Sequence, residues 1–161
     1  MSSVGNCEEE DLENPVGRTM YVLNPLLEEI TIFGFGSKAE PAWESIAKLI
    51  RSAVLADGVK SIAKNAFEKC TEMNAISISN MVTSLEESAF QGCTKLTKVT
   101  LPGSVKSIGK HAFHGCTSLI EVIIPNSVKE IGKNAFSECT SLVSVKIPSS
   151  VTSLGDSAFC K

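Results

Sequence analysis

The sequence contains few aromatic residues and no surplus of charge of one sign. Phe, Tyr and Trp together make up 6% of the chain, and the formal net charge is −3. Five of the 18 acidic residues lie within residues 1–13, so the rest of the chain holds 15 basic residues against 13 acidic ones. A nearly neutral body offers no surface for a polyanion, and we expect no nucleic-acid partner.

Segments that carry a chain to or through a membrane are also missing. No basic-then-apolar leader follows Met1, and no apolar run approaches the length that spans a bilayer. No Asn-x-Ser/Thr sequon occurs, which disfavours a glycosylated extracellular protein. These absences predict a cytoplasmic protein without membrane insertion.

Motifs of catalytic and metal sites are absent as well. The sequence has no glycine-rich phosphate loop, no nucleophile elbow, no His-Glu-x-x-His and no Cys-x-x-Cys. His111 and His114 lie three residues apart, but zinc needs three or four ligands and no third follows nearby. We therefore expect no enzyme activity, no metal site and no cofactor.

A repeat of 23 residues, marked by an Ala-Phe pair, fills most of the chain. The apolar positions that keep this period are Val59, Val82, Val105, Val128 and Val151; Ile62, Leu85, Ile108, Ile131 and Leu154; Phe67, Phe90, Phe113, Phe136 and Phe159; Cys70, Cys93, Cys116 and Cys139; Met73, Leu96, Leu119 and Leu142; and Ile76, Ile78, Val99, Leu101, Val122, Ile124, Val145 and Ile147. A fixed period of about 20–50 residues indicates stacked units that bury these positions between neighbours.

Each repeat contains signals for its local structure. Alternation in Leu96–Leu101 predicts a short strand with Val99 and Leu101 pointing inward. Pro102 then ends the strand because proline has no amide hydrogen to donate. A second extended piece follows at Val105–Ile108, and residues 110–116 form a single helical turn in this interpretation.

Glycine precedes the predicted helical turn in three repeats, as Gly109, Gly132 and Gly155. The first two repeats have Ala63 and Glu86 there instead. Since residues with a Cβ atom rarely adopt a positive φ, we expect this position to have an ordinary backbone conformation.

The repeat Leu-x-x-Val-x-[Leu/Ile]-Pro-x-Ser-Val-x-x-Ile-Gly-x-x-Ala-Phe-x-x-Cys-Thr, clearest at 96–117 and 119–140, resembles the BspA-like leucine-rich repeat family. The resemblance implies a right-handed leucine-rich-repeat solenoid of the strand-rich α/β class. Its short parallel strands line the concave face, and second short strands and single helical turns form the other sides. It also implies adhesion or host-protein binding, with the cell surface as the alternative location.

Three segments divide the chain in this interpretation. Residues 1–20 are polar and acidic and are predicted to be a disordered arm. Residues 21–52 form an amino-terminal cap, with a strand near Ile30 and a helix after Pro41. Residues 53–161 hold four 23-residue repeats and part of a fifth.

The four cysteines that keep the repeat period are predicted to be small core residues. A coil spacing of about 4.8 Å exceeds the usual Cβ separation of about 3.5–4.5 Å in a disulfide. Cys7 and Cys160 fall outside the period and are expected to be the reactive thiols.

A candidate protein-binding face is formed by the residues that point outward from the predicted strands. They are Ser52, Val54, Ala75, Ser77, Lys98, Thr100, Glu121, Ile123, Ser144 and Lys146. The face is mixed in character and lacks an aromatic anchor. Five coils give a width of about 24 Å, which is small for a stable interface, so weak or multivalent binding is expected.

The sequence thus predicts a non-enzymatic protein-interaction or adhesion module that binds through its concave sheet or exposed loops. The alternative is a structural fragment or truncated duplicate. In that hypothesis the chain self-associates through an uncapped carboxy-terminal edge, because Phe159-Cys160-Lys161 stops inside a repeat. The protein partner is not identified by any motif.

Overall fold

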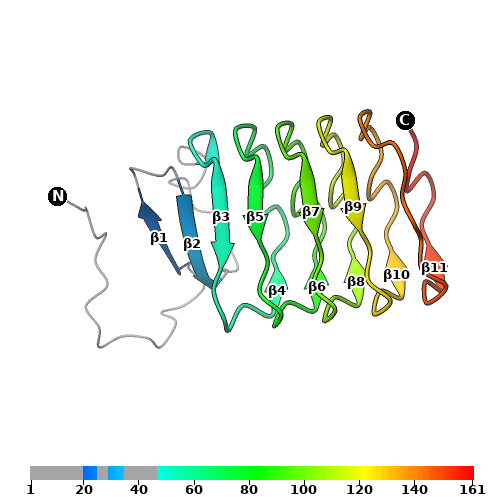
Figure 1. Cartoon of the computed structure of the whole chain (residues 1–161), viewed down its shortest axis with the longest axis horizontal. Coiled ribbons are helices and arrows are strands. Elements are labelled where there is room, and N and C mark those ends of the chain that lie inside the picture. The colour runs from blue at the N-terminus through cyan, green and yellow to red at the C-terminus, as the bar shows by residue number, and fades with distance from the viewer. Residues whose placement is uncertain (1–19, 25–28, 35–46) are drawn as a thin grey trace.

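The protein is a solenoid of short parallel strands, described in a computed structural model for residues 20–24, 29–34 and 47–161. One long face carries β1 (Met20–Asn24), β2 (Glu29–Gly34), β3 (Ser52–Leu55), β5 (Ala75–Ser77), β7 (Lys98–Thr100) and β9 (Glu121–Ile123), as Figure 1 shows. The opposite side carries β4 (Ser61–Ile62), β6 (Ser84–Leu85), β8 (Ser107–Ile108), β10 (Glu130–Ile131) and β11 (Ser153–Leu154). The repeat period therefore corresponds to one coil.

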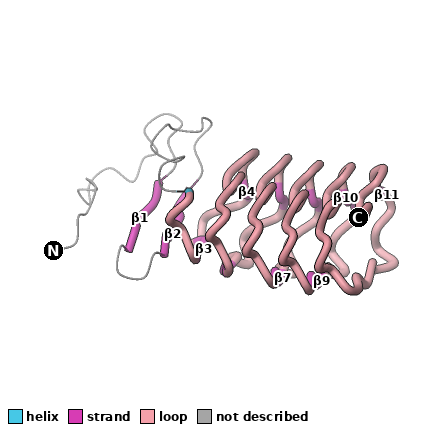
Figure 2. Tube along the Cα trace, turned by 90° about the horizontal axis from the view of Figure 1, so that it is seen from above, coloured by secondary structure: helices cyan, strands magenta, loops and turns pink. Residues whose placement is uncertain are grey.

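The two rows of strands lie on opposite sides of the coils, as the view from above shows (Figure 2). The short strands β4, β6, β8, β10 and β11 form one parallel sheet in that spatial order. Their partners are 23 residues apart, as in Ser84 with Ser107. The strands are parallel because each coil returns to the same side in the same direction.

On the long face, β1 pairs antiparallel with β2, and β2, β3 and β5 continue as a parallel sheet. Strands β7 and β9 form a separate two-stranded parallel sheet beside β5. The predicted alternation is confirmed there, because Val99 is buried between the exposed Lys98 and Thr100. The outward residues of this face therefore line up in columns along the solenoid.

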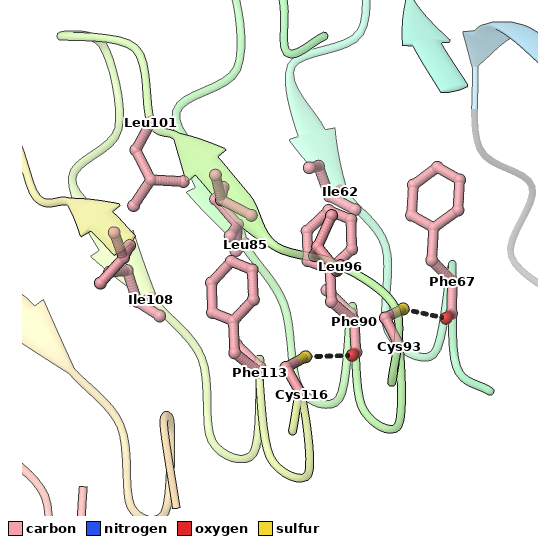
Figure 3. Packing of buried hydrophobic residues seen from close by; sticks show 14 of the residues in the cluster. Ile62, Phe67, Leu85, Phe90, Cys93, Leu96, Leu101, Ile108, Phe113 and Cys116 are labelled. Atoms are coloured by element: carbon pink, nitrogen blue, oxygen red, sulfur yellow. Dashed lines mark hydrogen bonds between the residues drawn. The ribbon is translucent and has the colours of Figure 1, made fainter. Parts of the chain in front are cut away.

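The core consists of columns of identical or similar residues, one from each coil. Phe67, Phe90, Phe113, Phe136 and Phe159 stack face to face with centroid separations of 5.0–5.2 Å. Figure 3 shows three of these rings, Phe67, Phe90 and Phe113, with Ile62, Leu85 and Ile108 nearby. Because the ring spacing matches the distance between parallel strands, packing and backbone pairing support the same repeat.

The periodic cysteines are buried and unpaired, as predicted, and they also make hydrogen bonds. The thiols of Cys93, Cys116 and Cys139 each donate to the phenylalanine carbonyl of the preceding coil, at 3.1–3.2 Å. Two of these bonds are drawn in Figure 3. A cysteine at this position thus fills space and satisfies a buried carbonyl.

The helical turn predicted after each second strand is not observed, and residues 110–115 are a run of tight turns. His111 and Gly115 have left-handed φ angles of 56° and 69°, which interrupt a right-handed helix. The amides of His111, Phe113 and Gly115 donate to carbonyls of the next coil at 2.7–3.0 Å. The amides between them, such as that of His114, donate to carbonyls three residues earlier, so pairing between coils alternates with tight turns.

In the last three coils, glycine precedes these turns at a point where two backbones approach each other closely, whereas the first two coils have Ala63 and Glu86 at this position. The φ angles of Gly109, Gly132 and Gly155 are ordinary, as predicted. A Cβ on Gly109 would lie 2.6 Å from the carbonyl carbon of Glu86, closer than nonbonded atoms tolerate. The glycines thus allow close stacking of successive coils.

The last coil departs from two predictions. Leu154 and Ile147, expected inside the core, are 53% and 42% exposed, and Val145 is half-buried. Residues 142–148 form no strand, although a strand was predicted around Val145. Among the described residues, no coil packs against the far side of this last coil. Its side chains therefore lack the neighbours that bury the equivalent residues of earlier coils, such as Leu101 and Ile124.

Several predictions for the amino-terminal part lie outside the described residues. They include the acidic arm through residue 19, Cys7, and most of the helix after Pro41. Within the described part, Ala47 and Ile50 are buried, as the helical pattern predicted. Strand β1 was not predicted.

Candidate functional site: the outward strand face

The predicted binding residues lie along β3, β5, β7 and β9 and on the segment that follows β9. We call the surface made by their side chains the strand face: Ser52, Val54, Ala75, Ser77, Lys98, Thr100, Glu121, Ile123, Ser144 and Lys146. Ser52 and Val54 are half-buried and the other eight are exposed. Parallel pairing sets each residue beside the one 23 positions later in the paired strands, as with Thr100 and Ile123.

The charge in the middle of the strand face is largely compensated. Lys98 and Glu121 are register partners on β7 and β9, and Lys98 Nζ lies 2.8 Å from a Glu121 carboxylate oxygen. Both side chains are more than half exposed, so the pair contributes little to stability. Lys146, in contrast, forms no ion pair with any residue that the structure describes.

An apolar patch adjoins the carboxy-terminal end of the strand face. It consists of Ile120 (55% exposed), Ile123 (47%), Val143 (82%) and Ile147 (42%). Of these four residues, only Ile123 was predicted to belong to the binding face. The sequence contains a signal for two of the others. Ile120 and Val143 are apolar at the repeat position where the earlier repeats have the polar residues Asn74 and Thr97.

A cavity of about 310 Å³ opens beside this apolar patch. Val143 and Ile147 belong to both, and Phe136, Phe159 and Lys161 complete much of the lining. The walls are mainly apolar, with a lysine at the edge. Phe136 and Phe159 belong to the inward phenylalanine column, so the cavity lies at the end of the core in the last described coil.

The two histidines lie on the turn side, away from the strand face. Their ring centroids are 5.4 Å apart. His111 Nε2 lies 3.0 Å from Asn134 Nδ2, and His114 Nδ1 lies 2.7 Å from Ser137 Oγ. Burial and the neighbouring Lys110 lower the pKa of His111. Among the described residues, no three His, Cys, Asp or Glu side chains gather closely enough to hold a metal ion.

Burial makes the periodic cysteines poor nucleophiles. Desolvation raises the pKa of Cys70 to about 12 and the pKa of Cys139 to about 11. It also raises the pKa of Cys93 and of Cys116. Because the thiolate is the reactive form, these four thiols are protected in the folded protein.

Thiol titration at pH 8 should separate these cysteines from Cys160. In a Cys7→Ser chain, a disulfide reagent should modify one thiol, the exposed Cys160, within minutes. The four buried thiols should react only as fast as the protein unfolds, and all five should titrate in denaturant. A second fast thiol in the folded protein would contradict the burial of this column.

The chain belongs to the BspA-type leucine-rich repeat family. Residues 44–161 match the BspA type leucine rich repeat region in 6 copies. This match covers more than half of the chain. No curated protein sequence matches the chain.

Solved bacterial leucine-rich repeat proteins share the fold. A Treponema pallidum leucine-rich repeat protein is 23% identical with a TM-score of 0.60, covering 85% of this chain and 83% of its own. A leucine-rich cell surface protein from Faecalibacterium prausnitzii is 24% identical, with a TM-score of 0.57. The matched region covers 91% of this chain and 52% of that protein. The pneumococcal vaccine antigen PcpA is 19% identical, with a TM-score of 0.62. The matched region covers 90% of this chain and 48% of that antigen. The chain therefore spans about half of the latter two structures.

Within residues 20–24, 29–34 and 47–161, no helix has the length and hydropathy needed to cross a bilayer.

Proposed function

We propose that the protein is a non-enzymatic interaction module that binds another protein through the strand face. The observation that carries this proposal is the ordered row of exposed side chains on β5, β7 and β9, held by a continuous core. Solenoids present extended binding surfaces of this kind because stacking fixes the spacing of each column. The family membership supports the same class of function.

The composition of the strand face supports modest affinity for a single copy. Its central Lys98–Glu121 pair is internally neutralised, and its columns contain Ser77 and Thr100 in place of aromatic residues. Hot spots of tight interfaces are usually aromatic or arginine side chains. Several copies acting together would strengthen binding without new contacts.

A surface location is part of this proposal. The support comes from the likeness to a bacterial cell surface protein and to a vaccine antigen. This proposal differs from the cytoplasmic location expected from the sequence.

The binding face can be tested by comparing two exposed threonines. A tetramerised form of the chain would be screened against an array of purified protein domains, and the affinity of each hit measured for the monomer. Thr100→Arg on β7 should weaken binding at least tenfold by placing a bulky cation in the face. The control Thr83→Arg, just before β6 on the opposite side, removes a hydroxyl hydrogen bond to the Lys60 carbonyl at 3.1 Å but should change the Kd less than twofold.

Loss of binding in Thr83→Arg, with Thr100→Arg unaffected, would assign the interface to the other side of the solenoid. Far-ultraviolet dichroism of both variants checks that each remains folded. Both threonines are exposed, so neither change is expected to disturb the core.

A further inference from the structure

We propose that a group of lysines beside β8 and β10, away from the strand face, is a second interaction surface whose occupant is an acidic segment of a partner protein. We call this surface the lysine patch: Lys106 directly before β8, Lys129 directly before β10, and Lys110 and Lys133 on the turns that follow these strands. All four side chains are exposed. The inference does not depend on the strand face, and its support comes from register, charge and spacing.

Hydrogen bonds between coils place these lysines side by side in two columns (Figure 1 shows the strands that carry them). The Lys129 amide donates to the Lys106 carbonyl at 2.8 Å. Lys133 follows Lys110 by the same 23 residues, and its carbonyl accepts from the His111 amide at 3.0 Å. Because neighbouring strands are about 4.8 Å apart, each column holds two ammonium side chains at adjacent positions.

Lysines elsewhere in the solenoid are compensated by the neighbouring coil. Three exposed lysines pair with an acid 23 positions away: Lys64 with Glu87 at 2.8 Å, Lys95 with Glu72 at 2.6 Å, and Lys98 with Glu121 at 2.8 Å. In the lysine patch, each lysine has another lysine 23 positions away. Like charges at directly neighbouring positions of a sheet repel and destabilise it. An anionic partner would remove this repulsion.

Nearby acids leave most of this charge uncompensated. Glu87 lies 3.5 Å from Lys110 but is also bound by Lys64 at 2.8 Å. Glu130 and Asp156 are the other acids next to the patch, and neither forms an ion pair with a described residue. The other three lysines of the patch likewise form none with the described part of the chain. Although the chain without residues 1–13 is nearly neutral, positive charge is thus concentrated here.

The charge of the patch acts on a neighbouring side chain, that of His111. Burial is the largest cause of its lowered pKa, and Lys110, His114 and Lys133 lower the pKa further. Nearby cations disfavour the protonated imidazole, whereas a bound anion would favour it. Binding of an acidic segment should therefore raise the pKa of His111.

The spread of the lysines suits an extended acidic segment. Lys106 and Lys110 are four residues apart, so their Cα atoms are separated by at most about 14 Å. Side chains on one side of an extended strand recur about every 7 Å, and three alternate acidic residues therefore reach from one column to the other. Ser107 and Glu130, the outward residues of β8 and β10, are polar, so the patch itself offers no apolar side chain to a bilayer interface.

Hexaglutamate, blocked at both ends, tests the patch against the matched neutral peptide hexaglutamine. In NMR titrations of the isotope-labelled full chain at low salt, hexaglutamate should shift the amide signals of residues 106–110 and 129–133 saturably and raise the pKa of His111. Hexaglutamine should do neither. The Kd for hexaglutamate should rise at least fivefold between about 20 and about 200 mM salt, because salt screens exposed charges. Shifts centred elsewhere, or equal effects of the two peptides, would overturn the proposal.

A charge reversal within the patch and one outside it separate local recognition from net charge. Lys129→Glu should weaken hexaglutamate binding at least fivefold, because it replaces a cation of the patch with an acid beside Lys106. Lys146→Glu makes the same change in net charge at an exposed residue of the strand face and should change the Kd less than twofold. Lys129→Glu should unfold at no lower temperature than the original chain at low salt, since it removes a repulsion. Equal weakening by the two variants would contradict a localised site.

A membrane surface and the chain's own acidic residues are the other occupants that the test distinguishes. Sedimentation of the chain with vesicles that contain phosphatidylserine, without any response to hexaglutamate, would assign the patch to a bilayer and overturn the inference. Replacing Glu8, Glu9 and Glu10 with glutamine should leave the amide signals of the patch unchanged when no peptide is present. A shift of those signals would assign the patch to the chain's own acidic segment instead of a partner.

Discussion

Replacing Phe113 with alanine should lower the free energy of unfolding by about 3–5 kcal/mol. The ring is fully buried and stacks on Phe90 at 5.0 Å and on Phe136 at 5.1 Å. Its removal leaves a cavity in the middle of the column and weakens the contacts on both sides. Urea denaturation followed by far-ultraviolet dichroism would measure the loss, provided that the m-value is unchanged.

Phe159→Ala is the matched control within the same column. Phe159 is half-buried and stacks on one ring only, Phe136 at 5.1 Å. The expected loss is about 1–2 kcal/mol, since less surface is removed from contact with the core. Equal losses for the two variants would mean that the central ring gains nothing from its second neighbour. A lowered m-value for Phe113→Ala would instead show that the coils unfold separately.

A single methyl group at position 132 should destabilise the protein nearly as much as the loss of a ring. The Cβ of Gly132→Ala would lie 2.5 Å from the amide nitrogen of Lys110 and 2.6 Å from the carbonyl carbon of Gly109. Both residues are tied to the preceding coil, because the Gly109 amide donates to the Leu85 carbonyl and the Lys110 carbonyl accepts from the Ser88 amide, so this backbone resists a shift. Overpacking usually costs about 1–3 kcal/mol, and we expect about 3 kcal/mol or more against a rigid backbone.

Gly103→Ala provides the control for this prediction. A Cβ at Gly103 would meet no atom within 4 Å, and its φ angle is ordinary. This change should leave stability within about 1 kcal/mol of the original, in the stabilising direction, because alanine restricts the unfolded chain. Thermal unfolding of the two variants side by side would compare them. A Gly132→Ala chain as stable as Gly103→Ala would contradict the close approach of the coils.

The inward columns could be predicted from the sequence because every coil poses the same packing problem. Phe113, Cys116 and Leu119 recur at a fixed spacing, and the structure buries all three completely. The strand alternation around Val99 was equally readable, since a period of two assigns successive residues to opposite faces. Repetition of these signals in successive coils outweighed the ambiguity of any single short strand.

The turns were predicted less well, because their hydrogen bonds join residues in different coils. Residues 110–116 look helical when considered alone, yet Phe113 donates its amide to Ala135 of the next coil. Glycine at 132 likewise suggested a turn, whereas the structure shows that it prevents a backbone clash. Contacts between distant residues determined both features.

The sequence by itself determined the 23-residue coil, the buried columns and the outward positions of the strand face, because these follow from periodicity and burial. The tertiary structure alone decided how the carboxy-terminal coils present Ile120, Val143 and Ile147 beside a cavity. Whether an apolar residue is covered depends on the coil that stacks next to it. That neighbour is a property of the folded array and is not contained in the repeat pattern.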